Sequence, residues 1–330
     1  MTDLVDEGRP AAAGRAQAAH GLRLRALPVV WWAVVGAVVL GLQVYVFASW
    51  FADGGYRVEK APAAVGGGDS TRPADVWVPL SSVLGVLVLA VYLYRRCRAR
   101  RRLTFDALLF IGLLLASWQS PLMNWINPVL ASNVNVFGAV ASWGPYVPGW
   151  QGAGPHREAE LPLATLSICM TALIAAVACS KGIGMAAARR PRWGAARLVG
   201  FGFLLVMVFD LCEPLISFVG ISVWTRSVPE LTLWSGEWYQ FPLYQMVASA
   251  LFGAALGAMR HFRNARDETC LESGAGLLPP GVRAWARLLA VVGGANVCIG
   301  LYTGTHILFS LLDGGAPDRL PDFFRPPAGY

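Results

Sequence analysis

Two acidic side chains, Asp210 and Glu213, lie inside a long apolar stretch between Leu198 and Trp224. A helix over this stretch, at about 1.5 Å per residue, is long enough to cross a bilayer core of roughly 30 Å. Residues three apart lie on one face of a helix, so both carboxyls are predicted to point the same way. Because carboxylates are costly at membrane depth, they generally face a protein interior or a wet cavity and indicate a functional site.

Two neighbouring carboxyls in a low dielectric can hold a proton between them at neutral pH, because both cannot easily be ionised together. Such a pair suits general acid catalysis, in which one group protonates a leaving oxygen and the other stabilises the cation that forms. It also suits a proton-coupled transporter. In a purely structural role, the acids would hydrogen-bond neighbouring helices and Pro214 would only kink the span. The two residues alone leave catalysis, transport and structure open.

The rest of the chain indicates an all-α integral membrane protein, a polytopic helix bundle. Of its 330 residues, 55% are hydrophobic and 14% are charged, which is well outside the average for a soluble domain. The predicted domain covers 27–311, after a disordered cytoplasmic arm over 1–26 and before an outer C-terminal tail over 312–330. About seven transmembrane helices are expected from length and composition. They lie near 28–51, 76–94, 104–123, 161–179, 198–225, 238–259 and 284–311.

The basic residues alternate from loop to loop. Of the 27 Lys and Arg residues, 20 lie in the N-terminal arm and in the loops 95–103, 180–197 and 260–287. By the positive-inside rule, the N-terminus is predicted to be cytoplasmic and the C-terminus outside, in a multi-pass protein of the plasma membrane. Basic residues between apolar segments, rather than on one domain face, speak against a nucleic-acid partner. We expect the protein to be surrounded by membrane lipid instead.

Several kinds of site are not indicated by the sequence. The six cysteines form no C-x-x-C pair and have no histidine spacing suited to zinc, so we expect free thiols and no metal. A retinal Schiff base needs a lysine in the last span, whereas the chain has only Lys60 and Lys181. Soluble-enzyme motifs are also absent. We therefore expect no cofactor.

A few features outside the acid pair carry further expectations. The predicted outer loop 124–160 is rich in Trp and long for a connection, which leaves open a lid over a substrate or an interfacial aromatic belt. Gly253 and Gly257 form a small-xxx-small pattern that predicts close helix packing. Asn296 and His306 recur at about one face of the last span, where packing or hydrogen bonding is the expected role.

Four motifs occur together in this order: Ser120-Pro121-Leu122-Met123-Asn124-Trp125, Phe209-Asp210-x-x-Glu213, Gln240-Phe241-Pro242-Leu243 and Asn296-Val297. With this order and spacing, the chain resembles the AveC-like spirocyclase family of avermectin- and milbemycin-type macrolide biosynthesis. The resemblance covers roughly residues 117–311. It implies closure of a dihydroxy-ketone on a polyketide macrolactone into a spiroketal, in some members with a dehydration in the same ring system.

The expected enzyme is therefore a cofactor-free, membrane-embedded spirocyclase in which Glu213 and Asp210 share the acid and carboxylate roles. A hydrophobic macrolactone substrate partitions into lipid, which gives a physical reason for a site inside the membrane. Two alternatives are a proton-coupled carrier of a lipophilic small molecule and a scaffolding membrane subunit. The residues expected to contact the substrate are Asn124, Trp125, Trp143, Gln240, Tyr244, Asn296 and His306.

Overall fold

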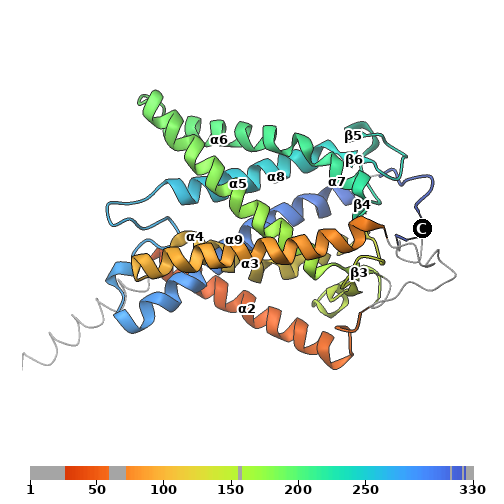
Figure 1. Ribbon diagram of the computed structural model, residues 1–330, viewed down its shortest axis with the longest axis horizontal. Helices are drawn as coiled ribbons and strands as arrows, with labels where there is room; N and C mark the ends of the chain where they lie inside the picture. Colours follow the sequence, from red (N-terminus) through yellow and green to blue (C-terminus); the bar gives the residue numbers. More distant parts are fainter. Residues whose placement is uncertain (1–26, 59–71, 155–157, 313, 322, 325–330) are drawn as a thin grey trace, which may run out of the picture.

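The computed structural model describes residues 27–58, 72–154, 158–312, 314–321 and 323–324. The arm over 1–26, for which disorder was expected, lies outside the described residues. Long helices run side by side in an elongated bundle (Figure 1). They are α2 (Pro28–Ala52), α3 (Pro73–Arg100), α4 (Phe105–Ala116), α5 (Pro162–Arg189), α6 (Ala195–Phe209), α8 (Leu243–His261) and α9 (Pro280–Ser310).

Among the described residues, six helical segments are long and apolar enough to cross a membrane, which confirms a membrane-type helical bundle. These segments are α2, α3, Phe105–Asn124, α5, Ala195–Val219 and α9. The remaining expected span corresponds to α8, which packs against α5, α6 and α9. This helix is only 19 residues long and carries Gln245 and Arg260, so it is less apolar than the others. It begins at Leu243 rather than near 238, because Phe241 and Pro242 form a strand.

Short elements close one end of the bundle (Figure 1). Three antiparallel strand pairs lie among them: β1 (Leu130–Ser132) with β4 (Ser222–Trp224), β2 (Val140–Ala141) with β3 (Ala159–Glu160), and β5 (Thr232–Leu233) with β6 (Phe241–Pro242). The short helices at this end are η2 (Ser117–Asn124), η3 (Gly144–Tyr146), η4 (Asp210–Cys212), α7 (Pro214–Val219) and η5 (Pro229–Leu231). Another short helix, η6 (Ala275–Leu277), lies at the opposite end, between α8 and α9. The pairing of β1 with β4 joins the long 124–160 loop to the segment after α7.

The chain also returns to this end after α9. Gly315 forms a bridge with Ser227, and Phe324 forms one with Asn133. The Phe324 side chain is buried against Val223 in a small apolar cluster. The described part of the predicted tail is therefore packed against the loops that close the bundle.

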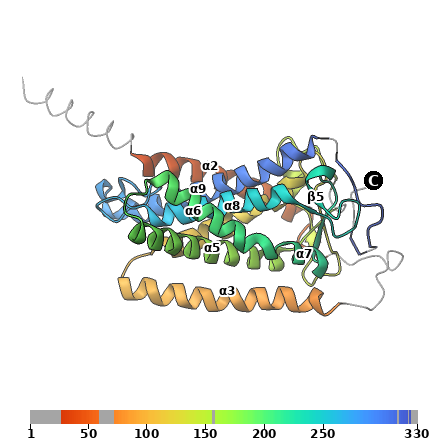
Figure 2. The same cartoon turned by 90° about the horizontal axis from the view of Figure 1, so that it is seen from above.

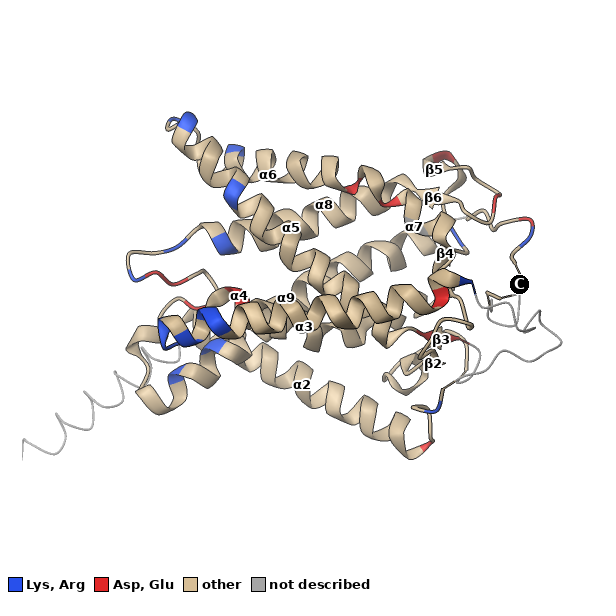
Figure 3. Ribbon diagram, in the orientation of Figure 1, with Lys and Arg blue, Asp and Glu red and all other residues tan. Residues whose placement is uncertain are grey.

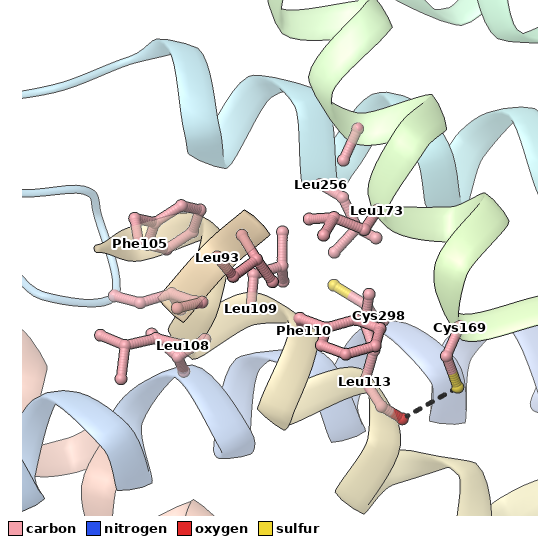
Figure 4. Close-up of a cluster of buried hydrophobic side chains, with 14 residues drawn as sticks. Leu93, Phe105, Leu108, Leu109, Phe110, Leu113, Cys169, Leu173, Leu256 and Cys298 are labelled. Carbon is pink, nitrogen blue, oxygen red and sulfur yellow. Dashed lines mark hydrogen bonds between the residues drawn. The ribbon is translucent and has the colours of Figure 1, made fainter. Parts of the chain in front are cut away.

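Helix α4 lies at the centre of the bundle and α3 at its edge. The span that contains α4 has 72% of its apolar window buried, against 17% for α3, which lies along one side of the bundle (Figure 2). Side chains of α4 meet those of α5 and α8 in the largest apolar cluster, where the Cys169 thiol also donates to the Leu113 carbonyl at 3.6 Å (Figure 4). The exposed apolar face of α3 is suited to lipid contact.

Glycines allow two pairs of helices to approach closely. A Cβ added to Gly36 of α2 would lie 2.0 Å from the Leu289 carbonyl oxygen of α9. A Cβ added to Gly257 of α8 would lie 2.5 Å from the Cys179 sulfur of α5. The predicted close packing at the small-xxx-small pattern of α8 is thus confirmed. All six cysteines are free, as expected.

Charged residues divide between the two ends of the bundle. Lys and Arg gather where α4 and α9 begin and α3 and α8 end, whereas the opposite end, which carries the strands, has few of them (Figure 3). This arrangement follows the alternation of basic loops in the sequence. The direction in which the bundle crosses a membrane stays a prediction.

Candidate functional site

The helix that carries the acid pair is interrupted at the pair itself. After Phe209, α6 changes to the 3-10 turn η4, and α7 begins at Pro214. Proline has no N–H and cannot continue the α-helical hydrogen bonds. The Asp210 carbonyl accepts instead from the Glu213 N–H at 2.9 Å. Pro214 therefore ends a regular helix at the acids, and Gly220, with φ of +76°, ends α7.

Both acids face α8, which confirms that they share one side of their segment. Gln245 Nε2 donates to Glu213 Oε1 at 2.6 Å, and the Ser249 hydroxyl, one turn further along α8, lies beside Asp210. Each carboxyl keeps one buried oxygen, Asp210 Oδ2 and Glu213 Oε2, without a hydrogen-bond partner among the described residues. Buried polar atoms are normally paired, so two free carboxyl oxygens in one place indicate a site for a ligand group or a proton.

The hydrogen bonds continue from α8 to α9. The Tyr302 hydroxyl donates to Gln245 Oε1 at 2.9 Å, so the Gln245 side chain joins Tyr302 to Glu213. One turn along α9, the His306 ring lies 4.9 Å from the Tyr302 ring. His306 is fully buried, and neither of its ring nitrogens has a partner among the described residues. We refer to Asp210, Glu213, Gln245, Tyr302 and His306 as the interior polar cluster.

Two of the residues expected to contact the substrate border this cluster. Tyr244 stacks on Phe309 with ring centroids 4.0 Å apart and lies 5.7 Å from the His306 ring. Gln240 is fully buried and donates to the Trp224 carbonyl at 3.0 Å. The Trp224 ring stacks on His306 at 5.0 Å. Gln240 therefore holds the segment whose Trp224 ring packs on His306.

The other expected contact residues lie around η2, on a different side of the bundle interior. The Asn296 carboxamide oxygen accepts from Trp118 Nε1 at 3.0 Å and from Gln119 Nε2 at 2.8 Å. Trp143 Nε1 donates to the Trp118 carbonyl at 2.6 Å, and Trp125 Nε1 donates to the Gly149 carbonyl. These bonds fasten the tryptophan-rich loop to η2 and α9. Asn124, Trp125, Trp143 and Asn296 thus form a second group of the predicted residues.

An apolar groove of about 330 Å³ lies beside this second group. Its volume is at the lower end of the range for small-molecule pockets. Gln119 and Asn296 are its only carboxamide residues among a mostly aliphatic and aromatic lining. The lining residues are Val39, Leu42, Trp118, Gln119, Leu122, Trp125, Val147, Pro148, Asn296 and Val297.

A second pair of buried acids lies behind η2, and it was not predicted from the sequence. The Glu160 carboxylate accepts from the hydroxyls of Ser120 and Ser142, and Asn124 Nδ2 donates to Glu158 Oε2 at 3.2 Å. Glu158 Oε1 has no partner among the described residues. Burial raises the pKa of Glu158 to about 8 and the pKa of Glu160 to about 7, against hydrogen bonds that act in the opposite direction.

The Glu-Ala-Glu spacing directly before a span could have indicated this pair. Alternate residues of a strand share one face, and Glu158 and Glu160 do converge behind η2. Asn124 is saturated by the protein: its Oδ1 accepts from the N–H groups of Val129 and Leu130, and its Nδ2 also donates to the Leu130 carbonyl at 2.8 Å. Asn124 therefore clamps a turn and holds Glu158.

Met123 of η2 connects the second group with the interior polar cluster. It packs with Trp224, Phe241 and Met246, and Tyr302 of the cluster packs against the same apolar group. The two groups of predicted residues are therefore neighbours at η2. Among the described residues, no group of three or more His, Cys, Asp or Glu side chains is arranged to hold a metal ion.

A family model named spirocyclase AveC-like matches residues 100–330. No curated protein and no solved structure matches the chain. The match includes both acid pairs, η2, the tryptophan-rich loop, α8 and α9, and it leaves α2 and α3 outside. The matched region is well over half of the chain, and its motifs are those that form the two neighbouring groups. The chain therefore belongs to the AveC-like spirocyclase family.

Proposed function

We propose that this protein closes a dihydroxy-ketone of a polyketide macrolactone into a spiroketal, at a site inside the membrane. The observation that carries the proposal is the interior polar cluster, in which Asp210 and Glu213 each keep a buried oxygen without a partner among the described residues. Membership of a spirocyclase family supports this type of reaction. The free oxygens favour groups that exchange protons over groups that only hold helices together, since a structural pair would be fully hydrogen-bonded.

The chemistry needs one proton donor and one carboxylate. A substrate hydroxyl adds to the ketone and gives a hemiketal. Glu213 protonates the hemiketal hydroxyl, which leaves as water and forms an oxocarbenium ion. The Asp210 carboxylate stabilises this cation, the second substrate hydroxyl attacks it, and the proton of that hydroxyl restores the acid. In total, one ketone and two hydroxyl groups are consumed, and one spiroketal and one water molecule are formed.

The surrounding residues support a stereochemical role. Gln245 donates to Glu213 and is itself held by Tyr302, and the rings of Trp224 and Tyr244 pack against His306 beside them. A spiroketal can form without an enzyme in acid, so the protein's contribution is rate at neutral pH and selection of one face through positioning. The groove beside Trp125 and Asn296 would hold an apolar part of the macrolactone.

We also propose that the bundle lies in the plasma membrane with its basic end in the cytoplasm. This follows from the basic residues at the end where α4 begins, on the positive-inside rule (Figure 3). With that orientation, η4 and the strands lie toward the outer surface. A substrate dissolved in the bilayer would reach the cluster from the lipid and would not have to pass through the basic end.

The proposal is tested with purified protein and an open dihydroxy-ketone at neutral pH. The expected product is one spiroketal diastereomer, formed faster than in a protein-free control, and product mass shows whether a dehydration accompanies ring closure. Glu213→Gln keeps the shape and the bond to Gln245 but removes the transferable proton, so the rate should fall by about 100-fold to 10,000-fold. Asp210→Asn should reduce it less, because a neutral dipole partly replaces a carboxylate.

The matched control is Glu237→Gln, which changes an exposed carboxyl outside the cluster. It should leave the rate unchanged. Full activity in both cluster variants, with normal insertion and expression, would return the acid pair to a structural role. Proton-dependent uptake of the unchanged ketone into liposomes, without ring closure, would identify a carrier instead.

A further inference from the structure

A second pocket lies at the basic end of the bundle, away from the interior polar cluster. It encloses about 220 Å³ beside Arg260, in the last turn of α8. Gln245, which donates to Glu213, lies near the start of the same helix. Six arginines and two aspartates take part in its lining. The lining residues are Arg96, Arg100, Arg102, Leu103, Thr104, Phe105, Asp106, Arg260, Arg263, Asp267 and Arg287.

The two aspartates of the pocket are already engaged. Asp106 accepts two hydrogen bonds from Arg260, at 2.7 and 3.0 Å, in a bidentate pair. Asp267 accepts from Arg102 at 2.9 Å and from Arg263 at 3.1 Å. The two carboxylates therefore accept hydrogen bonds from three guanidinium groups. This leaves the lining with an excess of four positive charges.

Glu272, next to the pocket, offsets one of these charges, because Arg287 Nε donates to its carboxylate at 2.8 Å. The lining still keeps about three uncompensated guanidinium charges.

Two guanidinium groups remain without a strong partner. Arg100 has no hydrogen-bond or ion-pair partner among the described residues. Arg96 reaches only the Tyr92 hydroxyl at 3.1 Å and lies 3.7 Å from Asp106. Both project from the last two turns of α3 toward the pocket. Arg100, and the part of the Arg96 guanidinium that does not face Tyr92, therefore keep donors without a partner among the described residues.

The start of α4 adds a second source of positive potential. Thr104 caps this 12-residue helix by accepting from the Ala107 N–H at 3.3 Å. Thr104, Phe105 and Asp106 all border the pocket. Backbone N–H groups of a first helical turn have no partner within the helix, and the helix dipole favours an anion there. Asp106 uses part of this potential and does not neutralise the arginines around it.

We propose that this pocket binds a phosphate group. Guanidinium groups from separate elements converge on one small space, which matches a tetrahedral anion with several oxygens better than a planar carboxylate. The pocket lies at the basic end of the membrane-type helices. In the orientation proposed above, that end would lie near the phosphates of the cytoplasmic leaflet. An acidic phospholipid head group and a soluble phosphate compound share this chemistry, and the experiment below separates the two sources.

The first measurement is native mass spectrometry of the purified full chain, in detergent, with equal amounts of phosphatidylglycerol and phosphatidylcholine. A head-group site predicts retention of phosphatidylglycerol over phosphatidylcholine. Arg96→Gln combined with Arg100→Gln should reduce that retention by about tenfold or more, because two charge-assisted bonds are lost. Neither residue forms a strong internal ion pair, so the fold should persist.

The matched control removes the same charge from the same end of the bundle. Arg190→Gln combined with Arg192→Gln changes two exposed arginines in the α5–α6 loop, outside the pocket. This control should keep full retention of phosphatidylglycerol. The second measurement is calorimetric titration with inorganic pyrophosphate in detergent that carries no phospholipid.

The outcomes separate clearly. Preferential retention of phosphatidylglycerol that only the pocket variant loses supports a head-group site. Saturable binding of pyrophosphate that only the pocket variant loses, without a lipid preference, assigns the pocket to a soluble phosphate compound. Binding of neither probe would overturn the proposal. Equal losses in both variant pairs would also overturn it, since the effect would then be diffuse surface charge.

Discussion

Replacement of Glu158 by Gln tests whether a carboxyl behind η2 is held protonated. In the folded protein, burial raises the pKa of Glu158 from its ordinary value of 4.5 to about 8. A folded-state pKa above the unfolded value means that the folded state binds the proton more tightly. The stability from this group is fully present below about pH 4.5 and is lost as the pH rises through about 8.

The magnitude follows from the size of this shift. At about 1.4 kcal/mol per pKa unit, the difference corresponds to roughly 5 kcal/mol, of which roughly 3 kcal/mol is already lost at pH 7. The side chain introduced by Glu158→Gln would keep an oxygen that accepts from Asn124 Nδ2, and it carries no charge at any pH. As the pH rises from 5 to 9, the wild type should therefore lose stability relative to Glu158→Gln.

The assay is thermal unfolding in detergent, followed by tryptophan fluorescence at a fixed scan rate from pH 5 to pH 9. The two proteins should unfold at similar temperatures at pH 5, and the variant should be more stable by several degrees at pH 9. Glu237→Gln, which changes an exposed carboxyl, should follow the wild type throughout. Parallel pH profiles for the wild type and Glu158→Gln would refute the assignment of a buried, proton-holding carboxyl.

Three further outcomes are expected. Trp150→Ala should lower the diastereomeric purity of the product, measured by chromatography, if the loop encloses the substrate; unchanged purity would favour an interfacial belt. Trp143→Ala should lower thermal stability by about 3 kcal/mol or more, because this ring is buried against Trp50. Fusion of a reporter after Tyr330 should give activity outside the cytoplasm, and activity of a cytoplasm-only reporter would reverse the proposed orientation.

The helical framework could be predicted because its signals are local. Length and apolar composition locate the spans, and the three-residue spacing of Asp210 and Glu213 places both on the side that faces α8. The approach of Gly257 to Cys179 follows from the small-xxx-small pattern in the same way. Each of these features depends on neighbours within a few turns of one helix.

The closed end of the bundle could not be predicted, because its contacts join residues far apart in the chain. β1 pairs with β4 across about ninety residues, and the strands are too short to show alternation. Glu160 meets Ser120 through the same kind of long-range contact. The Gln245 link between Glu213 and Tyr302 joins three different helices. Nothing in the local sequence of any one element specifies its partner.

The element that relates these regions is η2, and Pro121 explains its geometry. A proline inside a helix removes a donor and disfavours continued α-helical bonding, and the segment adopts 3-10 geometry with three residues per turn. Gln119, Leu122 and Trp125, three apart, all line the groove. In an α-helix the first and last of them would lie roughly 120° apart around the axis.

The residues between them point elsewhere. Ser120 and Asn124 meet the Glu158 and Glu160 pair, and Met123 packs toward Tyr302. This one eight-residue segment therefore serves as a wall of the groove, a support for a buried acid pair and a neighbour of the interior polar cluster. A change that restored α-helical geometry to η2 would rotate Trp125 off the groove and disturb the Asn124 clamp at the same time. Groove shape and the position of Glu158 are therefore linked through the backbone of this segment.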